Sequence, residues 1–395
     1  MRAGWLSAAT LAAVAIAPAV VGRPHLPAAP RSEPGTAQIR EADIGFFQQR
    51  IERDPSGALD LVRLGALYLS RFRQSGDEAD LVAAERAARR SLQNRDVRNA
   101  AALELLVAAL LGQHRFNDAR KTAERLVLVD PENAVAQASL GEVLLELGEY
   151  PAADRVFRKL SAQRYRLELA PRYARWLELR GRVGEARRLL EWAHAEIEAD
   201  DPAATEQLAW YELRLGELAL RFGAHREARE RLEAGLARLP DHWRLLAARA
   251  RLALAMGEYA TAIALGDSSL GQHLDPATLA VVGDAWMAQR DSGRAAEYYR
   301  ALEAATQAPA GRGGGFHRGW YLALLDHDRR VPEVLEAVTR ELRERHDVYG
   351  YDLLAWALYK SGRVAEARLA MARALEWGTE DPLLEAHARA IEAVR

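Results

Sequence analysis

The segment AVAQASLGEVLLELGEYPAADRVFRKL (134–160) has a counterpart in RLLAARARLALAMGEYATAIALGDSSL (244–270). Both segments contain Gly-Glu-Tyr, followed three residues after the tyrosine by an alanine, Ala153 in one and Ala262 in the other. Each copy has the pattern of two amphipathic helices joined by a tight turn. A structural unit that recurs along the chain is the strongest predictor of fold that a single sequence contains.

The alanine of the second helix marks the repeat along most of the chain. It occurs at Ala84, Ala119, Ala153, Ala186, Ala228, Ala262, Ala295 and Ala367. The first six gaps are 35, 34, 33, 42, 34 and 33 residues, around a period of 34, and the last gap of 72 leaves room for a divergent copy near Val334. A hairpin that is apolar on two sides cannot bury both alone, so the copies must stack.

This pattern resembles the tetratricopeptide repeat over residues 58 to about 381. The resemblance rests on small and large residues at the family's positions: Leu140-Gly141, Ala153 and Phe157 with Pro131 one repeat earlier, Leu64-Gly65-Tyr68, Leu215-Gly216 with Ala228 and Pro240, and Gly283, Ala295 and Tyr299. Small residues at the helix crossing let the two helices of a hairpin approach closely. The resemblance implies an all-α, right-handed α-solenoid of about nine hairpins between N- and C-terminal capping helices.

The remaining sequence divides into flanking regions. Residues 1–22 place Arg2 before an uncharged apolar run, the layout of a secretory signal peptide or of an uncleaved N-terminal anchor. Residues 23–37 hold four prolines and are expected to form a linker. We expect a capping helix in 38–57, the repeat array in 58–381 and a C-terminal capping helix in 382–395. The expected location is therefore outside the cytoplasm, in the periplasm or at the cell surface.

Two segments depart from the regular repeat. Around RFRQSGDEAD (71–80) the first copy has extra residues, which predict a long loop inside its hairpin. The glycine-rich run 311–315 interrupts the array before the eighth copy. A phosphate-binding loop would need a preceding strand and a following lysine, and neither is present in the sequence pattern, so we interpret the run as a loop between repeats.

Composition and motifs exclude several classes of function. The chain has 54 Lys and Arg against 56 Asp and Glu, a net charge of −2, and no cysteine. The absence of cysteine excludes disulfides and thiolate metal sites. The basic stretches are interleaved with glutamate, so they do not form the continuous positive surface that binds nucleic acid. Asp326, His327 and Asp328 are consecutive and diverge around a helix, so they do not predict a metal site. No catalytic motif is present, so we expect no enzyme activity, cofactor or metal.

The resemblance also implies which side chains face the concave groove. At the ninth position of the first helix the middle repeats carry Glu142, Arg175, Glu217, Arg251 and Asp284, which alternate in sign. Adjacent helices lie roughly 10 Å apart, so these residues are predicted to form a ladder of lateral ion pairs. The alternative is a groove that selects a charged peptide tail, which would need several unpaired like charges.

A second candidate surface lies on the first helix of the ninth repeat. Tyr349, Asp352, Trp356 and Tyr359 are spaced 3, 4 and 3 residues apart and form one stripe, which Phe316 and Trp320 of the preceding copy extend. Exposed aromatic side chains on a rigid helix are common interface anchors. Either this stripe binds a partner, or the C-terminal capping helix covers it and makes it part of the core.

The functional expectation follows from these exclusions. We expect a non-enzymatic scaffold in the cell envelope that binds a protein or peptide segment in its groove. The alternative is an accessory or regulatory subunit of an envelope enzyme or of a polysaccharide or secretion machine. The resemblance implies a protein or peptide partner, of the kind that exported bacterial members of the family bind. It implies no nucleic acid and no membrane insertion beyond an N-terminal anchor.

Overall fold

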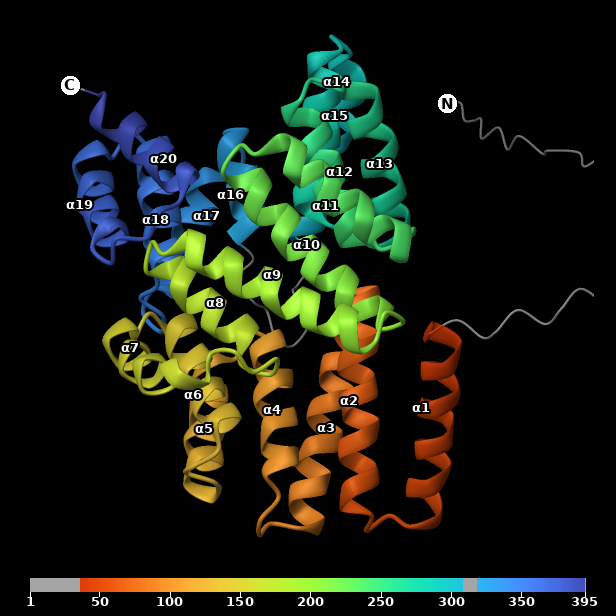
Figure 1. The fold of residues 1–395 in the computed structure, drawn as a ribbon. Coiled ribbons are helices and arrows are strands. Elements are labelled where there is room, and N and C mark those ends of the chain that lie inside the picture. The colour runs from red at the N-terminus through yellow and green to blue at the C-terminus, as the bar shows by residue number, and fades with distance from the viewer. Residues whose placement is uncertain (1–35, 308–317, 395) are drawn as a thin grey trace, which may run out of the picture.

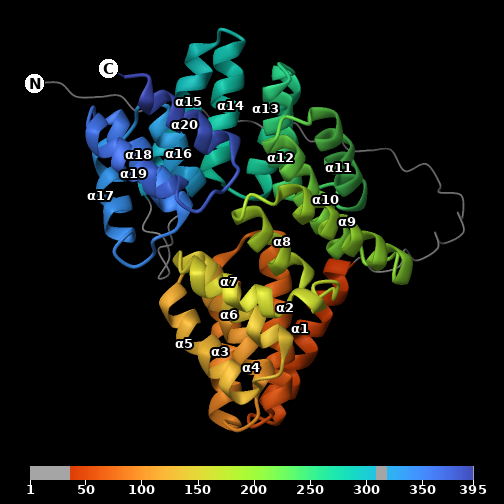
Figure 2. The same cartoon turned by 60° about the vertical axis from the view of Figure 1, so that its left-hand side comes forward.

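The computed structural model describes residues 36–307 and 318–394, and within these ranges the chain is helical (Figures 1 and 2). The expected signal segment, most of the linker and the glycine-rich run lie outside the described residues. The first helices of the hairpins are α2 (Ala58–Ser75), α4 (Ala100–Gly112), α6 (Ala134–Leu147), α8 (Ala170–Leu179), α10 (Thr205–Arg221), α12 (Trp243–Ala255), α14 (Pro276–Ala288), α16 (Arg318–Asp326) and α18 (Val348–Lys360). The second helices are α3 (Glu78–Asn94), α5 (Phe116–Val129), α7 (Tyr150–Lys159), α9 (Val183–Asp200), α11 (His225–Arg238), α13 (Tyr259–Gln272), α15 (Ser292–Gln307), α17 (Val331–Glu341) and α19 (Val364–Leu375).

The helices pack in consecutive pairs and form a solenoid, so the predicted fold class is confirmed. Helix α1 (Thr36–Arg53) precedes the described hairpins and α20 (Pro382–Glu392) follows them. A short 3-10 turn, Ser161–Gln163, connects α7 to α8. None of the described helices combines the length and apolarity that would be needed to cross a membrane.

Small residues explain why each pair packs closely. The eight repeat alanines are all completely buried, and Val334 takes their place in the divergent copy with 1% of its surface exposed. A Cβ on Gly141 would lie 2.8 Å from the Phe157 ring, and one on Gly283 would lie 2.6 Å from the Tyr299 ring. Glycine at these positions therefore lets an aromatic side chain of the second helix lie directly against the backbone of the first.

The first hairpin corrects one expectation. Its extra residues do not form a long loop, because α2 continues to Ser75 and α3 begins at Glu78. Gly76 ends α2 in the left-handed conformation, with φ of 76°, and Asp77 caps α3 by accepting a hydrogen bond from the Ala79 amide. The inserted sequence consists mainly of good helix formers, and it lengthens the helices instead of the loop.

The solenoid curves until its C-terminal part contacts its middle. We call this the C-terminal closure: the segment before α18 lies on the turn between α6 and α7. The His346 amide donates a hydrogen bond to the Leu147 carbonyl at 2.9 Å, and the Val348 amide donates one to the Tyr150 hydroxyl at 2.7 Å. The Tyr150 ring also stacks on Trp377 with centroids 5.0 Å apart. One hydrophobic core therefore joins the third and fourth hairpins to the ninth.

A second contact, the N-terminal closure, joins the start of the chain to the fifth and sixth hairpins. Arg40 of α1 forms an ion pair with Glu206 of α10 at 2.5 Å, and Ser70 of α2 donates a hydrogen bond to the same carboxylate at 3.2 Å. Gly76 at the end of α2 lies against the His273 ring. The two closures bring hairpins that are distant in sequence around a common interior, as the views in Figures 1 and 2 agree.

The C-terminal closure depends on the absence of a side chain at Gly148. We predict that Gly148→Ala destabilises the protein more than Gly223→Ala. Both glycines have positive φ, 77° and 73°, so both substitutions incur the same left-handed backbone penalty of about 1 kcal/mol. The new methyl group at 148 would overlap the His346 carbonyl, whereas nothing lies within 4 Å of the one at 223. Urea unfolding and small-angle scattering of both variants measure this, and equal stability with unchanged dimensions would contradict it.

Candidate functional site

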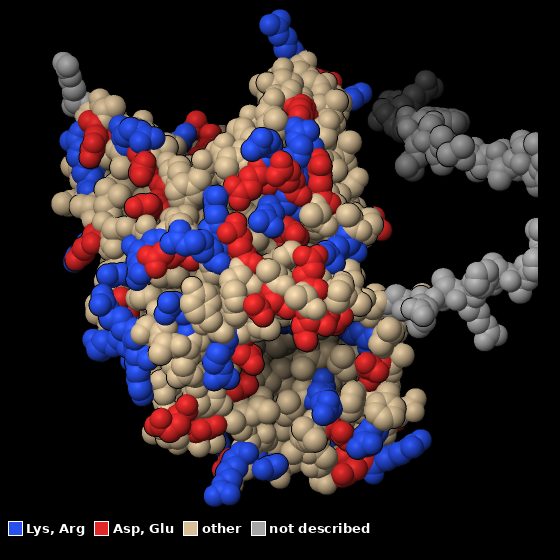
Figure 3. All heavy atoms as spheres, viewed as in Figure 1, with Lys and Arg blue, Asp and Glu red and all other residues tan. Residues whose placement is uncertain are grey.

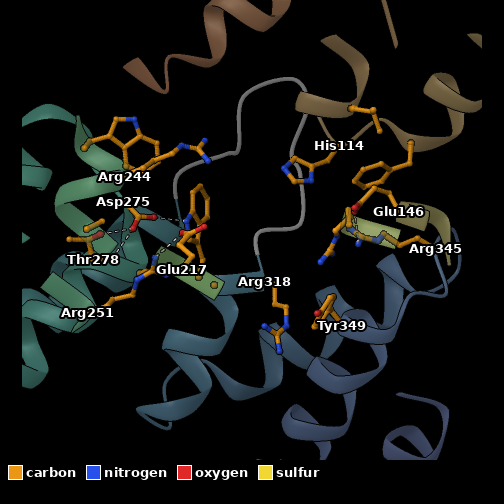
Figure 4. A pocket seen from close by; sticks show the side chains of 18 of the residues that line it. His114, Glu146, Glu217, Arg244, Arg251, Asp275, Thr278, Arg318, Arg345 and Tyr349 are labelled. Atoms are coloured by element: carbon orange, nitrogen blue, oxygen red, sulfur yellow. Dashed lines mark hydrogen bonds and ion pairs between the residues drawn. The ribbon is translucent and has the colours of Figure 1, made fainter. Parts of the chain in front are cut away.

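The interior of the solenoid contains a cavity of about 550 Å³ (Figure 4). Every first helix from α4 to α18 contributes to its wall. Its aromatic lining comes from His114, Phe116, Trp243, Trp320 and Tyr349. Its charged lining comes from Arg175, Arg244, Arg251, Arg318, Arg345, Glu142, Glu146, Glu217 and Asp275. Because the two closures join distant hairpins, the wall of this concave surface comes from repeats that are far apart in the sequence.

Most charges of the cavity are already paired. Glu217 binds Arg251 at 3.0 Å and Arg214 at 3.2 Å, and these arginines lower its pKa despite the burial that opposes them. Glu146 lies 3.6 Å from Arg345, and burial raises its pKa. On the outer surface seen in Figure 3, acidic and basic side chains are likewise interspersed.

The predicted charge ladder forms at only one of its four steps. The pair Glu217–Arg251 is present, as described above. Glu142 instead binds Arg172 of the neighbouring helix at 2.8 Å. Asp284 accepts a hydrogen bond from Tyr299 at 2.8 Å and lies 3.4 Å from His327. The ladder is therefore not continuous, because Glu142 and Asp284 have closer partners outside the predicted set.

The aromatic stripe of α18 is partly covered by the C-terminal helix. His387 of α20 stacks on Trp356 with ring centroids 4.1 Å apart, and Trp356 also stacks on Tyr359 at 5.0 Å. Trp356 donates a hydrogen bond to Asp326 at 2.8 Å. Both Trp356 and Tyr359 are half-buried. Trp356 therefore contacts α20 and α16, and Tyr359 stacks on Trp356, so the two rings do not form an open surface.

The other members of the stripe have separate environments. Tyr349 and Trp320 line the central cavity, whereas Phe316 lies outside the described residues. Asp352 is completely buried between Arg318 at 2.5 Å and His387 at 2.7 Å. Burial alone would raise the pKa of Asp352, but His387 and Arg318 outweigh it and hold that pKa below its usual value. The structure thus divides the predicted site between a cavity wall and a buried polar cluster.

Several cavity residues were not predicted. Arg244 and Ala277 occupy the second position of their repeats, which the family pattern also turns towards the groove, so tabulating that position would have identified them. His114, Asp275 and Arg345 lie in turns between helices, whose paths the repeat pattern does not predict. Within the described residues, no group of three or more His, Asp or Glu side chains is arranged to hold a metal ion.

Comparison with known proteins agrees with the repeat architecture. A family model for the tetratricopeptide repeat matches residues 105–164 and 213–278. Over these two segments the chain is similar to tetratricopeptide repeats. Proteins of this family are typically protein-binding scaffolds and are usually not catalytic, and no enzyme family was found. A comparison with curated proteins gives no match.

The chain also aligns with solved structures. A chain of the APC/C hetero-tetramer Cut9–Hcn1 aligns with a TM-score of 0.51 and 15% identity over 90% of this chain. The aligned region covers 59% of the Cut9–Hcn1 chain, which is less than two thirds of the length of that chain. PilF of Pseudomonas aeruginosa aligns at 0.42 with 21% identity, over 54% of this chain and 94% of its own. The human IFIT1 dimer with PPP-AAAA aligns with a TM-score of 0.44 and 14% identity, over 89% of this chain and 96% of the IFIT1 chain.

The buried cluster around Asp352 generates a pH-dependent prediction. Asp352→Asn should lower the free energy of unfolding at pH 7 by about 3 kcal/mol, because it removes one partner of a buried ion pair. The pKa of Asp352 is lower in the folded chain than in the unfolded chain. Its stabilisation is therefore fully present above the usual value of 3.8 and is lost as the pH falls through the lower folded value.

Urea titrations of both proteins between pH 7 and pH 3 test this. The difference between them should shrink below about pH 4. Glu366→Gln provides the matched control, since Glu366 also pairs with an arginine, Arg363, but both side chains are exposed. A difference that stays constant across this pH range would show that the charge of Asp352 does not stabilise the fold.

Proposed function

We propose that this protein is a non-enzymatic scaffold of the cell envelope that binds a peptide segment in its central cavity. The observation that carries the proposal is the convergence of eight successive first helices on one concave space. Its volume of about 550 Å³ falls within the range of ligand-binding pockets, roughly 300–1,000 Å³. That volume accommodates a few residues of a partner chain rather than a folded domain.

The chemistry of the wall supports binding rather than catalysis. Aromatic rings and arginines both line the cavity, and such residues dominate the binding energy of protein interfaces. The cavity acids are held by arginines or by helix-cap hydrogen bonds. Asp275, for example, accepts from the Thr278 amide at 3.0 Å and from Trp320 at 3.2 Å. Carboxylates restrained in this way are poorly placed to exchange protons with a substrate.

The envelope location rests on the sequence of residues 1–22. An initial arginine, an uncharged apolar run and small residues at Ala17 and Ala19 are the features of a secretory signal. The absence of cysteine is compatible with an oxidising compartment. The four prolines of 23–37 would separate the repeats from the membrane surface.

Site-specific photo-crosslinking tests the binding site. A photoreactive residue at Ala277, on the cavity wall, should form crosslinks to a bound partner in an envelope extract. The same residue at Ala237, which is exposed on α11, should not. Ala277→Trp should fill part of the cavity and reduce partner capture, while Ala237→Trp should leave capture unchanged. Crosslinks from position 237 but not from 277 would place the partner on the outer surface and contradict the proposal.

Cell fractionation tests the location. The full chain should be found in the periplasmic or membrane fraction, and a variant that lacks residues 1–22 should remain in the cytoplasm. Both proteins contain the complete described region, so circular dichroism should show equal helicity. Finding the full chain in the cytoplasm would contradict the proposed export.

A further inference from the structure

The nearly balanced charge of the whole chain conceals one segment in which basic residues are concentrated. The chain has 54 Lys and Arg against 56 Asp and Glu, but residues 155–188 contain eleven Lys and Arg and only three acids, Glu168, Glu178 and Glu185. Seven of these eleven basic side chains are exposed. We call them the basic surface: Arg155, Arg158, Lys159, Arg164, Arg166, Arg182 and Arg188.

The basic surface lies on the outer side of the third and fourth hairpins. It comprises one side of α7, the connection from α7 to α8, and the N-terminal end of α9. Arg155, Arg158 and Lys159 share that side of α7, because residues three and four apart are neighbours on a helix. Blue atoms accordingly gather over α7 at the left edge of Figure 3. Because α7 and α9 are second helices, this surface faces away from the central cavity, to whose wall the first helices contribute.

Electrostatic effects show that these three parts form one surface. Burial raises the pKa of Tyr173, and the charges of Arg164, Arg182 and Arg158 oppose that rise. Arg182 binds Glu185 at 2.7 Å and lowers its pKa, and the charges of Arg188 and Arg164 lower it further. Charges affect a group in this way only when they lie near it. The basic side chains of α7, of the connection and of α9 are therefore neighbours in space.

The acids that interleave with these basic residues in the sequence offset them only in part. Glu178 is buried and binds two arginines of α10, at 3.1 and 3.3 Å, so it does not neutralise the exposed side chains. Glu168 and Glu185 pair with Arg166 and Arg182. Among the described residues, no carboxylate oxygen lies within 4.0 Å of four members of the basic surface, which are Arg155, Lys159, Arg164 and Arg188.

An exposed aromatic side chain lies beside these charges. Tyr165 is 55% exposed, and the guanidinium of Arg164 lies 4.7 Å from the centroid of its ring. The ring also packs edge-on against Trp192, with centroids 5.1 Å apart, which restrains its orientation. Tyrosine and tryptophan are enriched where a membrane meets water, because their rings are apolar and carry a polar group at one end. Basic and aromatic groups are thus presented together on an outward-facing surface.

We propose that the basic surface docks the repeats on a membrane that contains anionic phospholipid. The inference rests on the envelope location in the proposed function, which brings phospholipid headgroups to the protein and keeps nucleic acid away. The positive charges are spread over two helices and their connection instead of lining a groove, so they match a plane of many phosphates. Because the central cavity faces the interior, docking through α7 and α9 leaves it accessible to a protein partner.

Vesicle co-sedimentation with the full chain tests the inference. One set of vesicles consists of phosphatidylcholine, and the other of equal parts of phosphatidylcholine and phosphatidylglycerol. Any contribution of the apolar residues 1–22 is common to both sets, so the ratio of the two affinities reports the charge preference. The anionic vesicles should bind at least about a hundredfold more tightly at low ionic strength, because each basic residue near an anionic surface contributes about fivefold. The preference should largely disappear at high ionic strength.

Two triple variants with the same change in net charge locate the docking surface. The test variant removes three exposed charges that have no ion pair to lose, by Arg155→Gln, Lys159→Gln and Arg188→Gln, and it should reduce the preference for anionic vesicles at least about tenfold. The control variant removes exposed charges of α1, α3 and α15, by Arg53→Gln, Arg86→Gln and Arg300→Gln, and it should keep the preference.

Two single substitutions complete the set. Tyr165→Ala should weaken vesicle binding at both low and high ionic strength, because salt does not screen an aromatic contact. Circular dichroism and thermal unfolding identify any variant that fails to fold. If the triple test variant fails to fold, Lys159→Gln alone replaces it, with an expected loss of about fivefold.

The outcomes separate this inference from the proposed function. Equal binding to both sets of vesicles, or an equal loss in the test and control variants, overturns the inference, while crosslinking at Ala277 still tests the scaffold function separately. If the full chain fractionates with the cytoplasm although the purified chain prefers anionic vesicles, the proposed location is wrong and the docking surface is supported. If the test variant loses self-association in analytical ultracentrifugation but binds vesicles as the unmodified chain does, the basic surface binds a second copy of the chain, and the membrane inference is wrong.

Discussion

The backbone contact between His346 and Leu147 is the constraint on which the interior depends. A stack of identical hairpins would leave an open concave face, and its two walls would be set only by contacts between neighbours. Here the His346 amide, just before α18, donates directly to the Leu147 carbonyl at the end of α6, across roughly half of the array. Such an approach requires a residue without Cβ at Gly148. The closed interior, with its shared hydrophobic core, follows from this contact and from the N-terminal closure.

Enclosure changes what each charge in the cavity contributes. On an open surface, an ion pair such as Glu217–Arg251 contributes under about 1 kcal/mol, and an unpaired arginine is hydrated at little cost. In the cavity the exposure differs from group to group: the side chain of Arg251 is 44% exposed, whereas that of Arg345 is 9% exposed, so pairing matters more for Arg345. The pKa of Glu146 is raised by burial and that of Glu217 is lowered by its arginines, although both acids face the same space. The electrostatic environment of a carboxylate therefore differs between the part of the wall at Glu146 and the part at Glu217.

The repeat pattern in the sequence predicted the hairpins, but it predicted neither of the two closures. The spacing of Ala84 to Ala367 predicted the stacked pairs because small residues at helix crossings are a local requirement. Gly-Glu-Tyr occurs at both 148–150 and 257–259, yet only Gly148 meets a distant segment, whereas Gly257 contacts only Tyr259 of its own turn. No local signal distinguishes the two. The charge ladder was incomplete for the same reason, because Glu142 and Asp284 found partners outside the predicted stripe.

The closures also couple binding to shape. A ligand that contacts Arg175 of α8 and the ring of Tyr349 on α18 touches both limbs of the solenoid, so it binds the closed form better than an opened one. By linkage, such a ligand stabilises the closure by the difference between its affinities for the two forms.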